Sequence, residues 1–153
     1  MTYQTPTQTM EWIKENIRDP IPQNDKSRLS EWMDVLTHED DHSLPEKEAA
    51  LKALGLMSLR YGAFFVITCG IVPLIKHYLL SDNRQLSLQA ARSVKYIAQS
   101  GGCDELIQDG VDEDLKTIIK DIHKDFDIRD MCARALGWIA AYPPAEIKSD
   151  IIQ

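Results

Sequence analysis

The stretch CARALGWIA, residues 132–140, decides the fold, because the chain contains two earlier versions of it. AARSVKYIA occupies residues 90–98 and ALKALGLMS occupies residues 50–58, so the stretch recurs after 40 and then 42 residues. Its small and apolar residues follow the three- and four-residue spacing of a helix face. A period of this length predicts stacked units of two or three helices, none of which can bury its apolar face alone.

The composition is that of a globular domain. Hydrophobic residues make up 44% and charged residues 27% of the 153 residues, as in ordinary soluble proteins. An apolar run of about 18 residues is absent, as is a basic-then-apolar N-terminus, so we expect neither a membrane span nor a signal peptide. Cys69, Cys103 and Cys132 show no CxxC spacing. They predict free, mostly buried thiols in a reducing compartment, the cytosol or the nucleus.

The net charge of −7 is unevenly distributed along the chain. Residues 1–48 contain 11 acidic and 5 basic residues, whereas residues 49–153 contain 13 acidic and 12 basic residues. A net acidic chain argues against general affinity for nucleic acids, which requires an excess of cations to neutralise phosphates.

The sequence divides at about residue 45. Residues 1–44 predict an N-terminal helical segment, with helices at 9–18 and 25–37 followed by an acidic loop. Ser43 and Glu46 have the spacing of a capping box, and Pro45 suits the first turn of a helix. Residues 45–153 predict the repeats, with long helices at 45–60, 85–99 and 127–141 and shorter ones at 63–69, 70–80, 103–109, 112–123 and 145–152.

The middle copy carries the most specific motif. Residues 64–98, FFVITCGIVPLIKHYLLSDNRQLSLQAARSVKYIA, resemble an armadillo repeat, with a short first helix, a glycine, Ile-x-Pro-Leu, an acidic turn and a long third helix bearing Ala-Ala. Residues 110–140 are similar to a second copy without the proline. The resemblance covers roughly residues 45–153. It implies an all-α, right-handed α-solenoid of armadillo-like (HEAT/ARM-type) repeats with an N-terminal helical cap, and a concave groove, lined by third helices, that binds extended protein segments.

Aligning the three long helices gives two positions, four residues apart, that share a helix face. They hold Lys52 and Leu56, Arg92 and Tyr96, and Arg134 and Trp138. In peptide-binding armadillo proteins these positions hold tryptophan and asparagine, and the asparagine binds the peptide backbone. Its absence here argues against a basic nuclear-localisation peptide, whereas the cations predict an acidic partner and a cation–π contact with the aromatic ring one turn on. Alternatively, the arginines are solvated and cover apolar helix surface with their stems.

The other candidate metal-binding or catalytic residues are expected to have structural roles instead. The run HEDDH, residues 38–42, contains two histidines but has no cysteine nearby, so we expect a charged loop rather than a zinc site. His77 and His123 are expected to be structural histidines among apolar residues on the shorter helices. The sequence shows neither a nucleophile motif nor a phosphate-binding glycine loop, and therefore predicts neither an enzyme nor a cofactor.

The repeat alignment also makes packing predictions. Ala91 and Ala133 should be buried where long helices meet, and Cys132 should be a buried, unreactive thiol because it takes an alanine position. Trp12 and Trp32 should pack on the open end of the first repeat; alternatively, they are anchors for an interaction partner.

The leading hypothesis is a non-enzymatic adaptor or scaffold that binds an acidic extended segment or helix. Three alternatives stay open. One is an armadillo-type nucleotide exchange factor of the 70-kDa heat-shock chaperones, which residues 8–11 thinly resemble. The others are a helical-repeat nucleic-acid binder and a structural subunit of a larger assembly, including self-association through the array ends. DIIQ, residues 150–153, matches ELIQ, residues 105–108, so we expect either a terminal cap or a piece of a longer protein.

Overall fold

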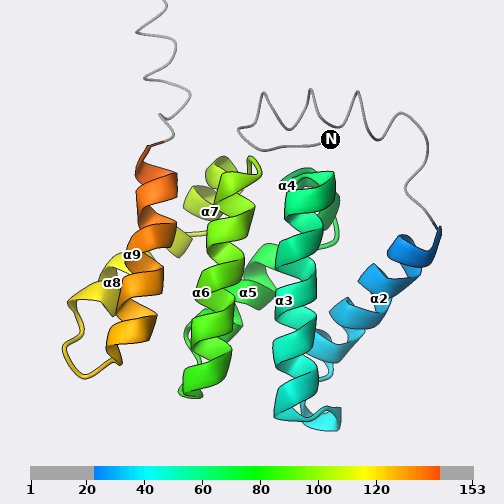
Figure 1. Ribbon diagram of the computed structural model, residues 1–153, viewed down its shortest axis with the longest axis horizontal. Coiled ribbons are helices and arrows are strands. Elements are labelled where there is room, and N and C mark those ends of the chain that lie inside the picture. Colours follow the sequence, from blue (N-terminus) through cyan, green and yellow to red (C-terminus); the bar gives the residue numbers. More distant parts are fainter. Residues whose placement is uncertain (1–22, 142–153) are drawn as a thin grey trace, which may run out of the picture.

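The computed structural model describes residues 23–141, and this part of the chain is all-α (Figure 1). It contains eight α-helices, one 3₁₀ helix and, within the same residues, no strand. In chain order they are α2 (Gln23–Thr37), η1 (Glu39–Asp41), α3 (Leu44–Tyr61), α4 (Ala63–Ile67), α5 (Ile71–Leu79), α6 (Arg84–Gln99), α7 (Cys103–Gln108), α8 (Val111–Lys120) and α9 (Phe126–Ala140). The helices predicted at 9–18 and 145–152, and Trp12, lie outside the described residues.

Local signals in the sequence explain where the helices begin. The predicted capping box at α3 is confirmed: the Glu46 amide donates to Ser43 Oγ at 3.3 Å, and the Ser43 amide donates to Glu46 Oε1 at 3.1 Å. α5 and α8 each begin directly after a glycine with positive φ, 85° at Gly70 and 75° at Gly110. Residues with a Cβ are strained in this region, so glycine suits both positions.

α8 ends earlier than the sequence predicts. Asp121 is extended, with ψ 103°, and the helix therefore stops at Lys120 rather than at residue 123. His123 lies in the following turn and is exposed. The prediction that His123 is a structural histidine on a helix is therefore wrong.

The three long helices α3, α6 and α9 lie side by side, and α5, α7 and α8 lie behind them (Figure 1). α6 is in the middle and packs on both α3 and α9. A single cluster of buried apolar residues runs from Leu29 in α2 through Val94 in α6 to Ile139 in α9. None of the helices in the described range is long and apolar enough to cross a membrane.

α3 and α6 approach closely because small residues meet at their interface. Ser93 Oγ donates to the Leu51 carbonyl oxygen at 2.7 Å in a buried hydrogen bond between the two helices. A Cβ added at Gly55 would lie 2.9 Å from Tyr96 Cδ2 and 3.2 Å from Ser93 Cα. No larger side chain fits between these helices without moving them apart.

One of the two alanine predictions is confirmed and the other is wrong. Ala91 is fully buried in α6, as expected for a residue between long helices. Ala133 is exposed, and it lies on α9, the last of the described long helices, which packs on α6 but has no further long helix beyond it in the described range. Gly137 and Ala140 are exposed with it, at the four- and three-residue spacing of one helix face.

At the opposite end of the row, α2 covers α3 and also touches α5. The Tyr61 hydroxyl donates to Asp25 of α2, and the Tyr78 hydroxyl donates to the Leu36 carbonyl oxygen at 2.7 Å. Trp32 is half-buried against the core, in agreement with its predicted packing role. Although the sequence predicts a boundary at about residue 45, α2 shares one continuous core with the helices that follow it.

The close approach of α3 and α6 can be tested with two glycines that occupy equivalent positions in the repeated stretch. Gly55→Ala should lower the free energy of unfolding by about 1–3 kcal/mol, because the new methyl group overpacks the interface. Gly137→Ala should raise it by about 0.5–1 kcal/mol, because nothing lies within 4 Å of its Cβ position and alanine is the better helix former. Denaturant unfolding measures both; equal stabilisation by the two changes would contradict the packed interface.

Candidate functional site

The six residues predicted to form a binding surface lie on α3, α6 and α9, and we call them the long-helix surface. Lys52 and Leu56 on α3 and Arg134 and Trp138 on α9 are exposed, whereas Arg92 and Tyr96 on α6 are half-buried. Two of the large apolar side chains are well exposed: 44% of Leu56 and 47% of Trp138 are accessible to solvent. Large exposed apolar side chains therefore occur on α3 and on α9, at the two sides of the half-buried α6 residues.

The cations of the long-helix surface differ in how far the protein itself neutralises them. Arg134 Nε lies 2.9 Å from Asp130 Oδ2 on the same helix. Arg92 Nη1 donates to Gln89 Oε1 at 3.0 Å, and its guanidinium pairs with no carboxylate between residues 23 and 141. Lys52 forms no ion pair with any residue that the structure describes. The uncompensated positive charge therefore lies on α3 and α6, and the α9 end is mixed.

The cation–π contact of this surface involves a residue that the alignment did not select. Lys95 Nζ lies 5.3 Å from the centroid of the Tyr96 ring, within the distance at which a cation is attracted by the ring face. Lys95 lies three residues after Arg92, so the two share a helix face. A search of the sequence for basic residues three positions after Arg92 would have found Lys95. Lys95 extends the basic area of the long-helix surface along α6.

Acidic residues at the start of α9 confirm that this end carries mixed charge. Arg84 at the start of α6 pairs with Asp125 and also with Asp127, whose Oδ2 lies 3.1 Å from Arg84 Nη2. These exposed pairs orient α9 beside α6 but contribute little stability individually.

Gln89 is a further residue that the sequence did not single out. Its side chain is buried, with 7% of the residue exposed. The Oε1 atom accepts from Arg92, but the Nε2 atom has no hydrogen-bond partner within residues 23–141. An unsatisfied buried donor of this kind is destabilising by about 1–3 kcal/mol. An acceptor that reached Nε2 would remove this cost.

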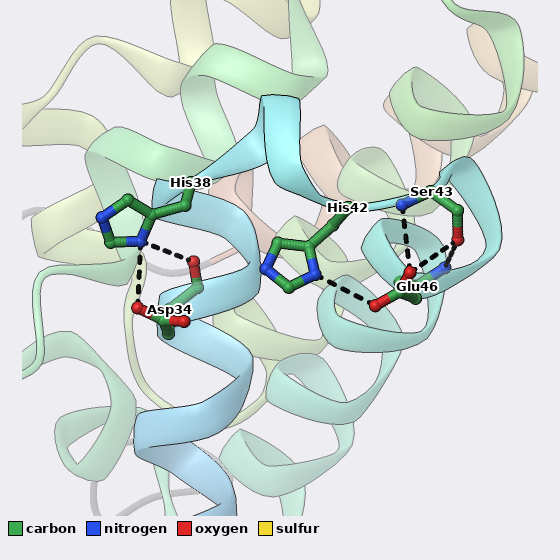
Figure 2. Close-up of polar contacts among 5 residues, drawn as sticks. All are labelled: Asp34, His38, His42, Ser43 and Glu46. Carbon is green, nitrogen blue, oxygen red and sulfur yellow. Dashed lines mark hydrogen bonds and ion pairs between the residues drawn. The ribbon is translucent and has the colours of Figure 1, made fainter.

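The two histidines of the HEDDH run bind different carboxylates and do not converge (Figure 2). His38 Nδ1 lies 2.9 Å from Asp34 Oδ1 of α2, and His42 Nδ1 lies 3.0 Å from Glu46 Oε2 of α3. Across the described part of the chain, no group of three or more His, Cys, Asp or Glu side chains could hold a metal ion.

His77 also differs from its prediction. It is exposed, and its Nε2 lies 3.0 Å from Glu39 Oε1 of η1. His77 is therefore one partner of a surface hydrogen bond that links α5 to the connection after α2, rather than a buried structural histidine.

Hydrogen bonds hold the Glu46 carboxylate in its charged form. The bond with His42, together with those from the backbone and side chain of Ser43, lowers the pKa of Glu46 from 4.5 to about 2 (Figure 2). Because the folded-state pKa lies below the unfolded value, the carboxylate stabilises the cap above about pH 4.5. This stabilisation is lost as the pH falls towards about 2.

Glu46→Gln should therefore lower the melting temperature at neutral pH and reduce its dependence on pH between about 4.5 and 2, since glutamine cannot gain a proton there. Thermal unfolding followed by circular dichroism across this range measures both effects. Glu48→Gln, the same change two residues further along α3, is the control. An acid-side profile of the Glu46 variant identical to that of the wild type would contradict the role of the cap.

The cysteines were predicted to be mostly buried, and two of them are. Cys103 and Cys132 are 1% and 0% exposed, and burial raises the pKa of the Cys132 thiol to about 12. Cys69 is exposed, which corrects the prediction for that residue. Its position between α4 and α5 explains the difference, because this connection lies at the surface.

A thiol reagent should therefore label Cys69 first in the native protein at neutral pH. Cys132 should react only as fast as the protein unfolds, because its sulfur is neither accessible nor ionised. Mass spectrometry of peptides after timed labelling with a maleimide measures the rates, and labelling in denaturant gives the accessible reference. Rapid native-state labelling of Cys132 would contradict its burial.

Comparison of the chain with models of protein families, with curated proteins and with solved structures finds no match of any of the three kinds. The structure therefore defines an all-helical domain without assigning it to a family.

Proposed function

We propose that this protein is a non-enzymatic interaction module, an armadillo-like α-solenoid whose long helices form a surface for an acidic protein segment. The observation that carries the proposal is the row formed by α3, α6 and α9, on which cations and large apolar side chains are exposed or half-buried. Lys52, Arg92 and Lys95 supply the charge without carboxylate partners among the described residues. Leu56 and Trp138 supply apolar contact area.

The charge distribution favours an acidic partner. The chain as a whole carries a net charge of −7, so an acidic segment would be repelled by much of the molecule and attracted to the α3–α6 part of this surface. Attraction between opposite charges raises association rates and selects the orientation of a partner. The partner's acidic residues would face Lys52 and Arg92, while Trp138 at the mixed α9 end would contact an apolar residue.

Geometry and the buried amide suggest how such a segment would lie. Packed helices are roughly 10 Å apart, a distance that an extended chain spans in about three residues. A carboxylate bound by Arg92 would compete with Gln89 Oε1 for the guanidinium. Rearrangement of the amide would then let Gln89 Nε2 donate to the partner, which would satisfy a donor that is otherwise unpaired in the described structure.

A nucleic-acid partner is less well supported. Phosphate binding requires several uncompensated cations along one surface, but Arg134 is paired with Asp130, and Asp127 is exposed at the start of α9. These carboxylates would lie beside a phosphate backbone that crossed from α6 to α9 and would repel it.

The proposal predicts that reversing two charges abolishes binding without unfolding the protein. Lys52→Glu with Arg92→Glu should leave the protein folded, because exposed Lys52 contributes little to folding and the loss of the Arg92–Gln89 hydrogen bond should cost only about 1–3 kcal/mol. The double variant should lose affinity for a fluorescent peptide with glutamate at every third position, measured by fluorescence anisotropy. Binding by the wild type should weaken as salt is added, because the Debye length is only about 8 Å at physiological ionic strength.

The matched control is Lys120→Glu, an equivalent reversal at the exposed end of α8. Lys76 is unsuitable, because its Nζ donates to the Asp109 carbonyl oxygen at 2.7 Å and so supports the fold. A double variant that binds the peptide as the wild type does would contradict the long-helix surface. Preference for single-stranded RNA over the acidic peptide would favour the nucleic-acid alternative instead.

A further inference from the structure

A pocket of about 220 Å³ lies between α2 and α3, at the edge of the long-helix surface. Its lining combines apolar and charged side chains: Asp25, Arg28, Trp32, Ala53, Leu56, Met57 and Arg60. Pockets that bind small molecules usually measure about 300–1,000 Å³. This one is smaller and open, so it suits one side chain of a larger partner rather than a free ligand or cofactor.

Four of the residues that line the pocket are apolar. Met57 is 7% exposed, and Trp32 is half-buried against the core, so both are held in place by packing. Leu56 is 44% exposed and belongs to both the pocket and the long-helix surface. The pocket is therefore continuous with the proposed binding surface, one turn along α3 from Lys52.

The charges at the pocket favour an acidic partner. Neither Arg28 nor Arg60 forms an ion pair with a carboxylate in the described part of the chain, and the Arg60 guanidinium instead lies 5.2 Å from the centroid of the Tyr61 ring. Asp25 lines the same pocket, but its carboxylate already accepts the Tyr61 hydroxyl. Arginine binds carboxylates through paired, planar hydrogen bonds. Two such groups beside an apolar pocket are complementary to a hydrophobic side chain that is flanked by acidic residues.

We propose that this pocket binds one leucine-sized apolar side chain of the acidic segment, while Arg28 and Arg60 pair with carboxylates that flank it. The inference rests on the proposed function and adds to it a point of anchorage that fixes the register of the segment along α3. A few buried anchors commonly carry most of the affinity of an interface, so the partner is selected by an apolar residue within the acidic stretch and not by charge alone.

The test uses the full chain and two synthetic peptides, one with a leucine between pairs of glutamates and the other with serine in its place. The wild type should bind the leucine peptide about tenfold more tightly than the serine peptide, since removing a partly buried leucine side chain loses about 1.4 kcal/mol. Ala53→Phe, which fills the pocket, should abolish this difference. Ala49→Phe, on an exposed site one turn earlier in α3, should preserve it.

Arg28→Glu provides a second variant that changes charge rather than packing. It should weaken binding of both peptides about tenfold while the melting temperature stays near that of the wild type. The proposal is overturned if the two peptides bind the wild type equally, or if Ala53→Phe retains the leucine preference. A concentration-dependent dimer in sedimentation that Ala53→Phe abolishes would also overturn it, in favour of a second copy as the occupant.

These outcomes separate the two proposals. Loss of binding in the Lys52→Glu/Arg92→Glu protein, with no effect of Ala53→Phe, would support the long-helix surface and overturn the pocket. The reverse pattern would support the pocket and overturn the long-helix surface. Failure of both peptides to bind the wild type would overturn both.

Discussion

The structure depends on the close contact between α3 and α6. Gly55 leaves no room for a Cβ against Tyr96, and Ser93 donates across the interface to the Leu51 carbonyl oxygen at 2.7 Å. This contact sets the distance between α3 and α6, and α6 in turn packs against α9. The same contact positions Tyr96 beside α3, so the packing of the core and the shape of the exposed surface have a common cause.

The two ends of the row of long helices differ in whether another described helix covers them. α2 covers one end, where Leu36 is buried and accepts the Tyr78 hydroxyl. At the other end, Ala133 and Gly137 are exposed on a face of α9 that no described helix covers. A face of small residues permits close approach of a further helix but does not identify one.

The chain is acidic overall, but a few of its cations have no carboxylate partner among the described residues. Arg134 is neutralised by Asp130 on its own helix, whereas among the described residues the Arg92 guanidinium contacts the Gln89 amide and no carboxylate. Residues that look equivalent in the sequence are therefore not equivalent electrostatically. The α3 and α6 part of the surface is the part that we propose for an acidic partner, and the α2–α3 pocket lies next to it.

The sequence by itself determined the helices and most of their ends, because capping residues, positive-φ glycines and apolar spacing act within a few residues of chain. The capping box of Ser43 and Glu46 and the glycine before α5 are such local features. Only the tertiary structure decided that Ala91 is buried while Ala133 is exposed. It also showed that Lys95 rather than Arg92 lies near the Tyr96 ring, and that Arg28 and Arg60 meet at one pocket. These properties depend on which helices become neighbours, and that depends on contacts between residues far apart in the chain.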